Sequence, residues 1–392
     1  MSYKTIEGGV TAPKGFRAAA KYCAIKVKKE PNPKPDVTVV VSDCEASCAA
    51  VFTTNKFCAA QVILGREVLK KGKARAFVIN SGNANAATGE QGIANAKKVE
   101  TELEKLLGLG EDEVFVSSTG VIGQQLPVEK LLAGLPEIVA NLSDKGGTEA
   151  ARAIMTTDTK LKEVAFELEL SGGTVRIGAM SKGSGMIHPN LATMLAYITT
   201  DAKVAAPVLQ KILAESADKS FNMTTVDGDT STNDSLFLIA NGASGVAIES
   251  EEDIAAFAKL VEDICIHMAR AIASDGEGAT HLIVVEARNL ATMQDARLVA
   301  RSIAGSNLFK AAVFGRDANW GRIMAAAGYS GADIDPTKAD CILKSDAGEV
   351  IVMEGGFGTQ FDEEKATAVL TEHDITVIVD FHSGDACATA YG

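Results

Sequence analysis

The chain of 392 residues is 46% apolar, which is enough to build a sizeable core in two or more domains. Its 51 acidic and 38 basic residues give a formal charge of −13, which argues against nucleic acid or an anionic membrane as a partner and leaves small molecules and other proteins. No stretch is long and apolar enough to span a bilayer, and the first residues lack the apolar core of a signal peptide, so we expect a cytoplasmic protein.

Strands and helices alternate after a proline-rich loop near residue 30. The loop is predicted because its prolines fix the backbone and remove hydrogen-bond donors. Short segments rich in β-branched residues predict seven strands, at residues 37–43, 74–82, 113–120, 174–180, 235–242, 282–289 and 375–381. Several of these strands follow each other through short Gly or Asn turns, which favours mixed or antiparallel sheets over a purely parallel one.

Two segments between the strands predict helices. Residues 253–273 carry an apolar side chain at every third or fourth position, so one face of this helix is apolar, and His267 within it is expected to pack. Residues 90–107 begin in a Gly-rich turn, and we expect the pairs Glu100 with Glu104 and Lys98 with Glu102 on a solvated face. The alternation of strands and helices predicts an α/β protein in which helices cover mixed sheets.

The domain organisation is predicted from a change in composition near DGEGATHLIVV. We expect a larger α/β domain over residues 1–280 and a smaller C-terminal α/β domain over residues 281–392. Seven scattered cysteines argue against a disulfide framework, so reduced thiols are expected. Cys44, Cys48 and Cys58 could hold a metal, but no nearby histidine completes a ligand set, and we expect no metal site.

Several common catalytic motifs fail when they are read position by position. The chain has no GxxxxGK[ST] phosphate loop and no GxSxG nucleophile turn. The acidic run 227–234 opens like a calcium loop, but Thr232 stands where glycine is expected and Leu238 where glutamate is expected, so a tight turn bonded to its own backbone is favoured. His188 is the histidine to consider for catalysis, although a turn role before Pro189 is favoured.

Five segments rich in hydroxyl groups and glycine remain, at residues 116–123, 153–160, 178–195, 221–234 and 274–281. Each of them alone reads as a turn. Together with GVTAPKGFRAA, VFTTNKFCAAQV, VINSGNANAATG, VFGRDANWGRI and HSGDACATAYG, they resemble the ornithine acetyltransferases of arginine biosynthesis, also called the bifunctional glutamate N-acetyltransferase family. The resemblance covers essentially the whole chain.

The resemblance implies a precursor that cleaves itself. In the family, the threonine of the LATML segment, here Thr193, attacks the preceding carbonyl and splits the chain into an α chain ending at Ala192 and a β chain beginning at Thr193. The new terminus places a hydroxyl nucleophile beside its own amine, which titrates at about 7.7–8.0 and can act as a base near neutral pH. The resemblance also implies a larger domain like that of the N-terminal-nucleophile enzymes and a heterotetramer of α and β chains.

Further site residues follow from the same match. Thr119 and Gly120 match the oxyanion hole of the family, which offers a hydroxyl and a backbone N–H to the tetrahedral intermediate. The substrate-binding positions of the family fall on Thr156, Lys182, Thr193 and Glu277. Because N-acetylornithine and glutamate share an amino-acid carboxylate and differ at the far end, we hypothesise that Lys182 meets this carboxylate and Glu277 meets a charged distal group.

The implied reaction transfers acetyl from N2-acetyl-L-ornithine to L-glutamate in two steps, through an acetyl ester on Thr193. Acetyl-CoA is a possible further donor, and no other cofactor is expected. Family members usually continue with a segment that supplies an asparagine and a serine or threonine to the substrate site, whereas this sequence ends at Gly392. Two alternatives stay open: an N-terminal-nucleophile amidase or aminopeptidase, and a non-catalytic remnant that binds amino acids.

Overall fold

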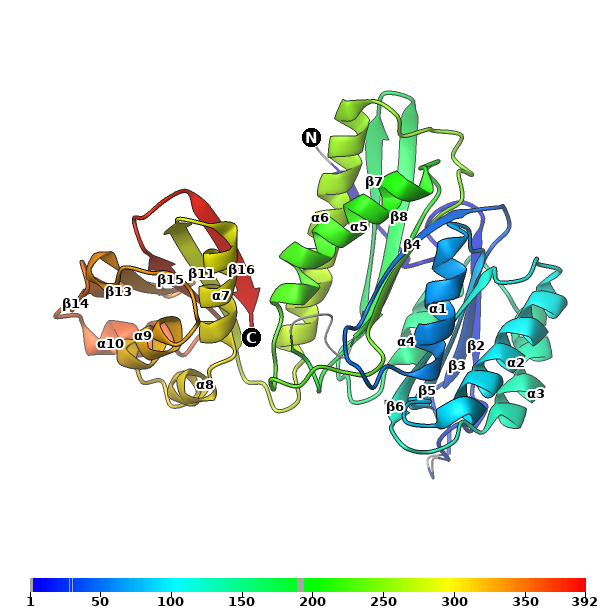
Figure 1. The fold of residues 1–392 in the computed structure, drawn as a ribbon, viewed down its shortest axis with the longest axis horizontal. Coiled ribbons are helices and arrows are strands. Elements are labelled where there is room, and N and C mark those ends of the chain that lie inside the picture. Colours follow the sequence, from blue (N-terminus) through cyan, green and yellow to red (C-terminus); the bar gives the residue numbers. More distant parts are fainter. Residues whose placement is uncertain (1–2, 28, 30, 189–193) are drawn as a thin grey trace. The chain divides into compact units, whose positions relative to one another are not determined.

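The computed structural model describes residues 3–27, 29, 31–188 and 194–392 (Figure 1). The chain is an α/β protein, as predicted, and it divides into two compact units. Unit 1 holds the described residues within 1–183, 193–217 and 230–268, and unit 2 holds those within 184–192, 218–229 and 269–392. The domain limits drawn from the sequence, 1–280 and 281–392, stay a prediction.

Unit 1 contains two mixed sheets. The first has the strand order β1-β7-β8-β9-β10-β4, with bounds Tyr3–Ile6, Lys162–Leu170, Gly173–Lys182, Leu195–Thr200, Ser235–Ala240 and Ser47–Phe52. The second has the order β2-β3-β5-β6, with bounds Phe16–Lys21, Val37–Ser42, Ala76–Asn83 and Val114–Val121. Strands β9 and β10 are parallel, as are β5 and β6, and the other pairs are antiparallel. The prediction of mixed sheets is confirmed.

The two sheets of unit 1 pack face to face around an aromatic cluster. Phe77, Phe115, Tyr197 and Phe237 come from strands of both sheets, and their ring centroids in contact lie 4.7–6.1 Å apart. Each such pair adds about 0.5–1.5 kcal/mol to the stability gained from burial alone. This cluster holds the two sheets in a fixed relation, so that the ends of their strands can form one site.

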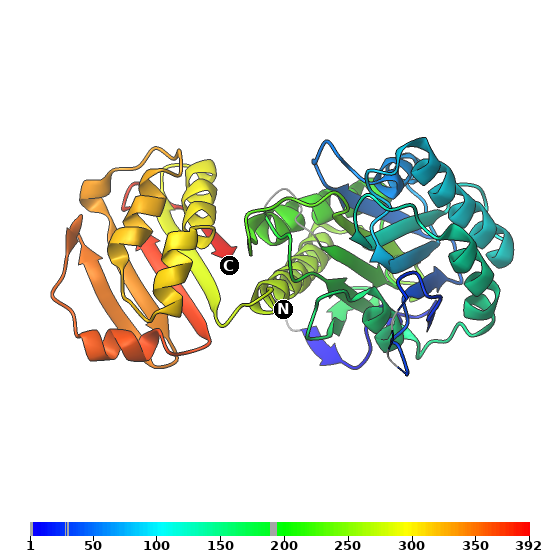
Figure 2. The same ribbon diagram turned by 90° about the horizontal axis from the view of Figure 1, so that it is seen from below.

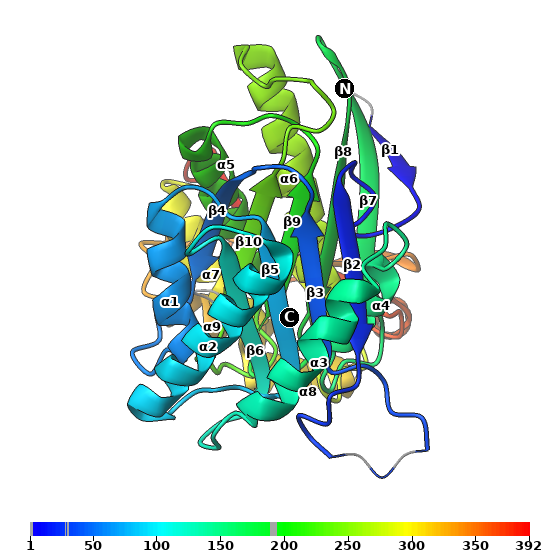
Figure 3. The ribbon, with the colours of Figure 1, turned by 90° about the vertical axis from the view of Figure 1, so that its right-hand side faces the viewer.

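Helices cover the outer faces of both sheets, which gives unit 1 four layers (Figures 1 and 3). α2 (Gly89–Leu107) and α3 (Val128–Ala140) pack on the four-stranded sheet. α5 (Ala206–Lys219) and α6 (Glu251–Ser274) lie over the six-stranded sheet. Two further helices, α1 (Ala60–Lys70) and α4 (Gly147–Ile154), also belong to unit 1. The helices predicted at 90–107 and 253–273 correspond to α2 and α6.

Two predictions about side chains on these helices are wrong. Glu100 and Glu104 are only 1% and 6% exposed, because the chain after α2 folds back over them. The Lys97 ammonium lies 3.1 Å from Glu100, and Glu104 accepts a hydrogen bond from the backbone N–H of Glu113. Burial therefore raises the pKa of Glu100 to about 7. His267 was expected to pack, but its side chain is exposed.

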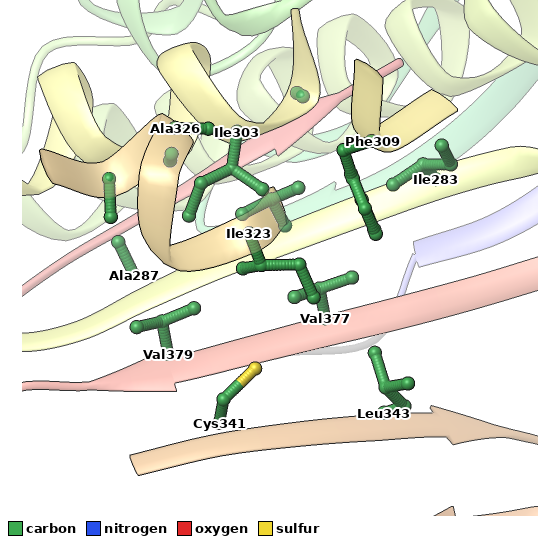
Figure 4. Packing of buried hydrophobic residues seen from close by; sticks show 14 of the residues in the cluster. Ile283, Ala287, Ile303, Phe309, Ile323, Ala326, Cys341, Leu343, Val377 and Val379 are labelled. Carbon is green, nitrogen blue, oxygen red and sulfur yellow. The ribbon is translucent and has the colours of Figure 1, made fainter. Parts of the chain in front are cut away.

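Unit 2 contains one sheet with the strand order β14-β13-β12-β15-β11-β16 (Figure 2). The strand bounds in that order are Phe357–Gly358, Gly348–Glu354, Asp340–Ser345, Asp374–Asp380, Leu282–Leu290 and Ala386–Tyr391. The helices are α7 (Met293–Ala304), α8 (Asn307–Phe314), α9 (Trp320–Gly328) and α10 (Glu363–Val369), with short 3-10 turns at Phe221–Met223 and Pro336–Lys338. Every second residue of a strand points at the helices, so Cys341 and Leu343 meet Ile303 and Ile323 in one core (Figure 4).

All seven cysteines are free; Cys48 is buried, Cys58 is partly buried and Cys44 is exposed. No cluster of three His, Cys, Asp or Glu residues that could hold a metal ion occurs in the part of the chain that the structure describes. Among the described helices, none is both long enough and apolar enough to cross a membrane.

Candidate active site

Thr119 and Gly120 lie at the end of β6, where the strand leaves the core of unit 1. Thr119 is only 4% exposed, and Gly120 has a φ of +137° that other residues rarely adopt. In the parallel pairing with β5, Gly120 lies opposite Gly82, and a Cβ on Gly120 would fall 2.3 Å from the carbonyl carbon of Gly82. The two backbones thus approach too closely for any side chain at position 120.

Gly120→Ala is expected to destabilise the protein by more than about 2 kcal/mol, because the new methyl group meets both backbone strain and a backbone clash. Thermal unfolding of the purified variant measures the effect. Gly123→Ala is the matched control, since Gly123 has a φ of +80° but open space around its Cβ position. Gly123→Ala should cost about 1–2 kcal/mol from strain alone. Equal losses in the two variants would contradict the close approach.

Lys182 and Thr156 meet at a buried carboxylate that sequence analysis did not single out, Asp158. Lys182 ends β8 and is 2% exposed, and its Nζ lies 3.9 Å from Oδ2 of Asp158. The same Oδ2 accepts the backbone N–H of Thr156 at 3.0 Å. Oδ1 accepts the N–H of Gly183 at 2.7 Å and the Nζ of Lys162 at 2.9 Å. Two of the predicted substrate-binding positions are therefore joined by one residue.

The carboxyl group of Asp158 is ionised despite its burial. Desolvation alone would raise its pKa, because the charged form loses water. The charges of Lys182 and Lys162 and the hydrogen bonds outweigh this effect and lower the pKa of Asp158 to about 2. A buried lysine pair around an ionised carboxylate makes this part of unit 1 strongly polar.

A second buried carboxyl, Asp234, lies beside the residue that follows Thr193. Its side chain is fully buried, and Oδ1 accepts the backbone N–H of Met194 at 3.0 Å. Oδ2 has no hydrogen-bond partner among the described residues. Burial raises the pKa of Asp234 well above its usual range, because the charged form loses its hydration. Thr193 and Ala192 themselves lie outside the described residues.

The neighbouring amide of Asn233 connects the two sheets at this end. Its Nδ2 donates to the carbonyl oxygen of Ser118 at 2.8 Å and to that of Ala84 at 2.6 Å. Ser118 directly precedes Thr119, so the start of β10 is tied to the strand that carries the predicted oxyanion donors. In the first sheet, Leu195 pairs with both Lys182 and Ser235. The predicted oxyanion donors, Lys182 and the start of β9 therefore gather at one end of unit 1.

The acidic run 227–234 is a tight turn, as predicted, but it does more than the sequence suggested. The N–H of Asp229 donates to Asp227 and that of Asn233 donates to the hydroxyl of Ser231, which confirms the local bonding. The long-range bonds of Asn233 and Asp234 were missed. The signal that could have found them is the pair of carboxamide and carboxylate placed directly before the buried strand β10.

Glu277 and His188 belong to unit 2. Glu277 is exposed, and its backbone N–H donates to the carbonyl oxygen of Ser184 at 3.0 Å. It lines a cavity of about 300 Å³ within unit 2, together with His281 and Lys310. Burial lowers the pKa of Lys310 to about 8. Nδ1 of His188 lies 3.1 Å from the hydroxyl oxygen of Thr225. Burial lowers the pKa of His188.

Comparison with known proteins places this chain in a family. The model of the ArgJ family matches residues 17–392. A relative from Symbiobacterium thermophilum, named arginine biosynthesis bifunctional protein ArgJ, is 49% identical over 389 residues, which are 99% of this chain and 95% of that protein. A relative of the same name from Caldanaerobacter subterraneus is 48% identical with the same coverage. Ornithine acetyltransferase from Mycobacterium tuberculosis, solved with ornithine, is 36% identical over 50% of this chain and 100% of its own, with a TM-score of 0.43.

Proposed function

This chain belongs to the ArgJ family, and from that premise we propose that it is the glutamate N-acetyltransferase of arginine biosynthesis, which moves acetyl from N-acetylornithine to glutamate. The identity of 49% over 389 residues is the observation that carries the proposal. The chemistry of unit 1 supports it: this unit holds the predicted oxyanion donors, and the buried Lys182 pairs with Leu195 at the start of β9. The attraction between the Lys182 ammonium and a substrate carboxylate would be stronger there than in water, because the local dielectric constant is low.

The reaction begins with attack of the Thr193 hydroxyl on the acetyl carbonyl of N-acetylornithine. The α-amine of Thr193, freed by cleavage after Ala192, takes the hydroxyl proton and passes it to the leaving amine of ornithine. Thr119 and Gly120 donate hydrogen bonds to the oxyanion of the tetrahedral intermediate. The amine of glutamate then attacks the acetyl ester, and N-acetylglutamate leaves with Thr193 restored.

The test is glutamate-dependent release of ornithine from N-acetylornithine by the purified protein. Ornithine and N-acetylglutamate should appear in equal amounts when glutamate is present, and little ornithine should appear without it. Ornithine and acetate released at the same rate without glutamate would identify an amidase instead. A cleaved protein that binds amino acids but releases nothing would identify a non-catalytic remnant. Adding acetyl-CoA in place of N-acetylornithine tests the second donor.

Lys182→Ala is expected to raise KM for both substrates by about tenfold to a hundredfold, because a hydrogen bond to a charged group contributes about 1.5–3 kcal/mol. Initial rates over a range of substrate concentrations measure this effect. Lys203→Ala removes an exposed lysine just beyond the far end of β9 and should leave KM unchanged. An unchanged KM in Lys182→Ala would remove Lys182 from the carboxylate site.

Glu277 is assigned to the charged distal group of the substrate, in line with its exposed position in unit 2.

The assembly we propose is a heterotetramer of α and β chains, located in the cytoplasm. Size-exclusion chromatography with light scattering tests the assembly. We propose no cofactor and no metal ion for the reaction, because the nucleophile and its base both come from Thr193.

A further inference from the structure

Asp158 is a fully buried carboxylate with four partners, Thr156, Lys162, Lys182 and Gly183. Its side chain is 0% exposed, and it receives two backbone N–H groups and the ammonium of Lys162 while it faces the ammonium of Lys182. The backbone donors come from Thr156 and Gly183, which belong to separate segments of the chain. Asp158 therefore fixes the spatial relation between the segment of Thr156 and the end of strand β8.

We propose that Asp158 is the positioning residue of the substrate-carboxylate site, which holds the Lys182 ammonium and the backbone beside Thr156 in the geometry that receives the carboxylate. The inference rests on the proposed function in one respect, namely that Lys182 meets the substrate carboxylate. Asp158 acts through Lys182 and does not touch the substrate. Its role is to keep a flexible cation in one place before the substrate arrives.

The physical reason lies in the flexibility of lysine. Fixing its four-carbon stem costs about 2 kcal/mol of rotamer entropy, which substrate binding would otherwise have to supply. A carboxylate held by three donors of its own is a rigid anchor, because moving it would break all three hydrogen bonds. The second carboxyl that influences Lys182 electrostatically is Asp234. Asp158 lies within ion-pair distance of Lys182, and its low pKa makes it an anionic anchor for that ammonium.

Asp158→Asn tests the anchor, because the change keeps the shape and removes the charge. We expect KM for N-acetylornithine and for glutamate to rise about tenfold, with kcat within about threefold of the wild type. Charge alone predicts the opposite sign, since loss of an anion beside Lys182 should strengthen binding of a carboxylate and lower KM. A lower or unchanged KM would therefore overturn the proposal.

A donor without the carboxylate separates positioning from general damage. N-acetylputrescine is N-acetylornithine without its carboxylate, so its KM should not depend on Asp158. We expect the preference for N-acetylornithine, measured as the ratio of the two kcat/KM values, to fall about tenfold in Asp158→Asn. Equal losses for the two donors would show a purely structural role and overturn the proposal.

A double-mutant cycle shows whether Asp158 acts through Lys182. In a Lys182→Ala background, Asp158→Asn should change KM little further, because the residue to be positioned is gone. Effects that multiply in full would mean that the two residues act independently, and would overturn the proposal. Purified Lys182→Ala and Lys182→Ala/Asp158→Asn proteins are compared under the same conditions.

The matched control is Asp201→Asn. Asp201 is also a buried carboxylate that accepts two backbone N–H groups, from Arg176 at 2.7 Å and Lys14 at 3.0 Å, but it follows the opposite end of β9. The Asp201→Asn variant should have a lower melting temperature than the wild type, but the same preference for N-acetylornithine over N-acetylputrescine. If Asp158→Asn fails to fold, Asp158→Ser leaves room for a water molecule at the two N–H groups and is measured in the same way.

Calorimetric binding of glutamate and ornithine distinguishes failure of this inference from failure of the proposed function. A wild type that transfers acetyl while Asp158→Asn and Asp158→Ser bind both amino acids with wild-type affinity would overturn the inference alone. A wild type that binds both amino acids but transfers nothing would overturn the proposed reaction. A tenfold weaker binding in Asp158→Asn would then still support the positioning role.

Discussion

Replacing Thr193 with alanine is expected to leave one uncut chain of 392 residues, 40.8 kDa in mass, and to abolish transfer of acetyl to glutamate. The variant lacks the Oγ that attacks the carbonyl of Ala192 during cleavage and the acetyl carbonyl during transfer. Loss of a covalent nucleophile in this kind of chemistry lowers kcat by about 10⁴-fold or more. Intact mass spectrometry of the purified protein and an ornithine-release assay measure the two effects.

The wild type is expected to give two fragments that meet at Ala192 and Thr193. Thr193→Ser is the matched control, because it keeps a hydroxyl group and an α-amine at the same position, so it should still be cut and should retain part of the activity. An uncut wild type that nevertheless transfers acetyl would contradict the cleavage mechanism. A cut Thr193→Ala variant would place the nucleophile elsewhere.

Thr119→Val is expected to lower kcat by about 100- to 1,000-fold while KM changes little, because one oxyanion donor contributes about 2.7–4 kcal/mol in the transition state. Valine has nearly the shape of threonine, so the buried position at the end of β6 stays filled. The tetrahedral intermediates of cleavage and of transfer share the same donors, so cleavage should slow as well. The cut fraction is therefore measured by mass, and kcat is expressed per cut molecule.

The control for this prediction is Thr119→Ser, which retains the hydroxyl and should recover most of kcat. A Thr119→Val variant with normal kcat would show that this hydroxyl does not reach the oxyanion. A variant with a higher KM and normal kcat would place Thr119 in ground-state binding of the substrate instead. The three outcomes are separated by one set of initial-rate measurements.

Part of the fold could be predicted from local sequence pattern. The β-branched segments at 37–43 and 375–381 form β3 and β15, as their composition predicts. The strands β4 and β16 were not predicted, because the segments SCAAVF and ACATAY are rich in alanine. They become strands only through pairing, β4 with β10 and β16 with β11. No local pattern could show these partners.

The site was predicted less completely than the fold, and for a different reason. Thr119, Gly120 and Lys182 came from resemblance, and the structure places them at one end of unit 1. Asp158 and Asp234 were missed because their burial, and the hydrogen bonds from Gly183 and Met194, come from distant segments and leave no periodic trace in sequence. Glu100 was misread on a helix for the same reason, since a returning loop decides its burial.

The strand order of the six-stranded sheet has a consequence for how the mature protein is made and kept. β9 and β10 follow residue 193, yet they lie between β8 and β4, which precede it. A cut after Ala192 would therefore leave two fragments interleaved in one sheet, with β8 bonded to β9 and β10 bonded to β4. Separating the two fragments would then require breaking the pairings of β8 with β9 and of β10 with β4. Each mature molecule would thus keep both halves of a single translation product for its whole lifetime.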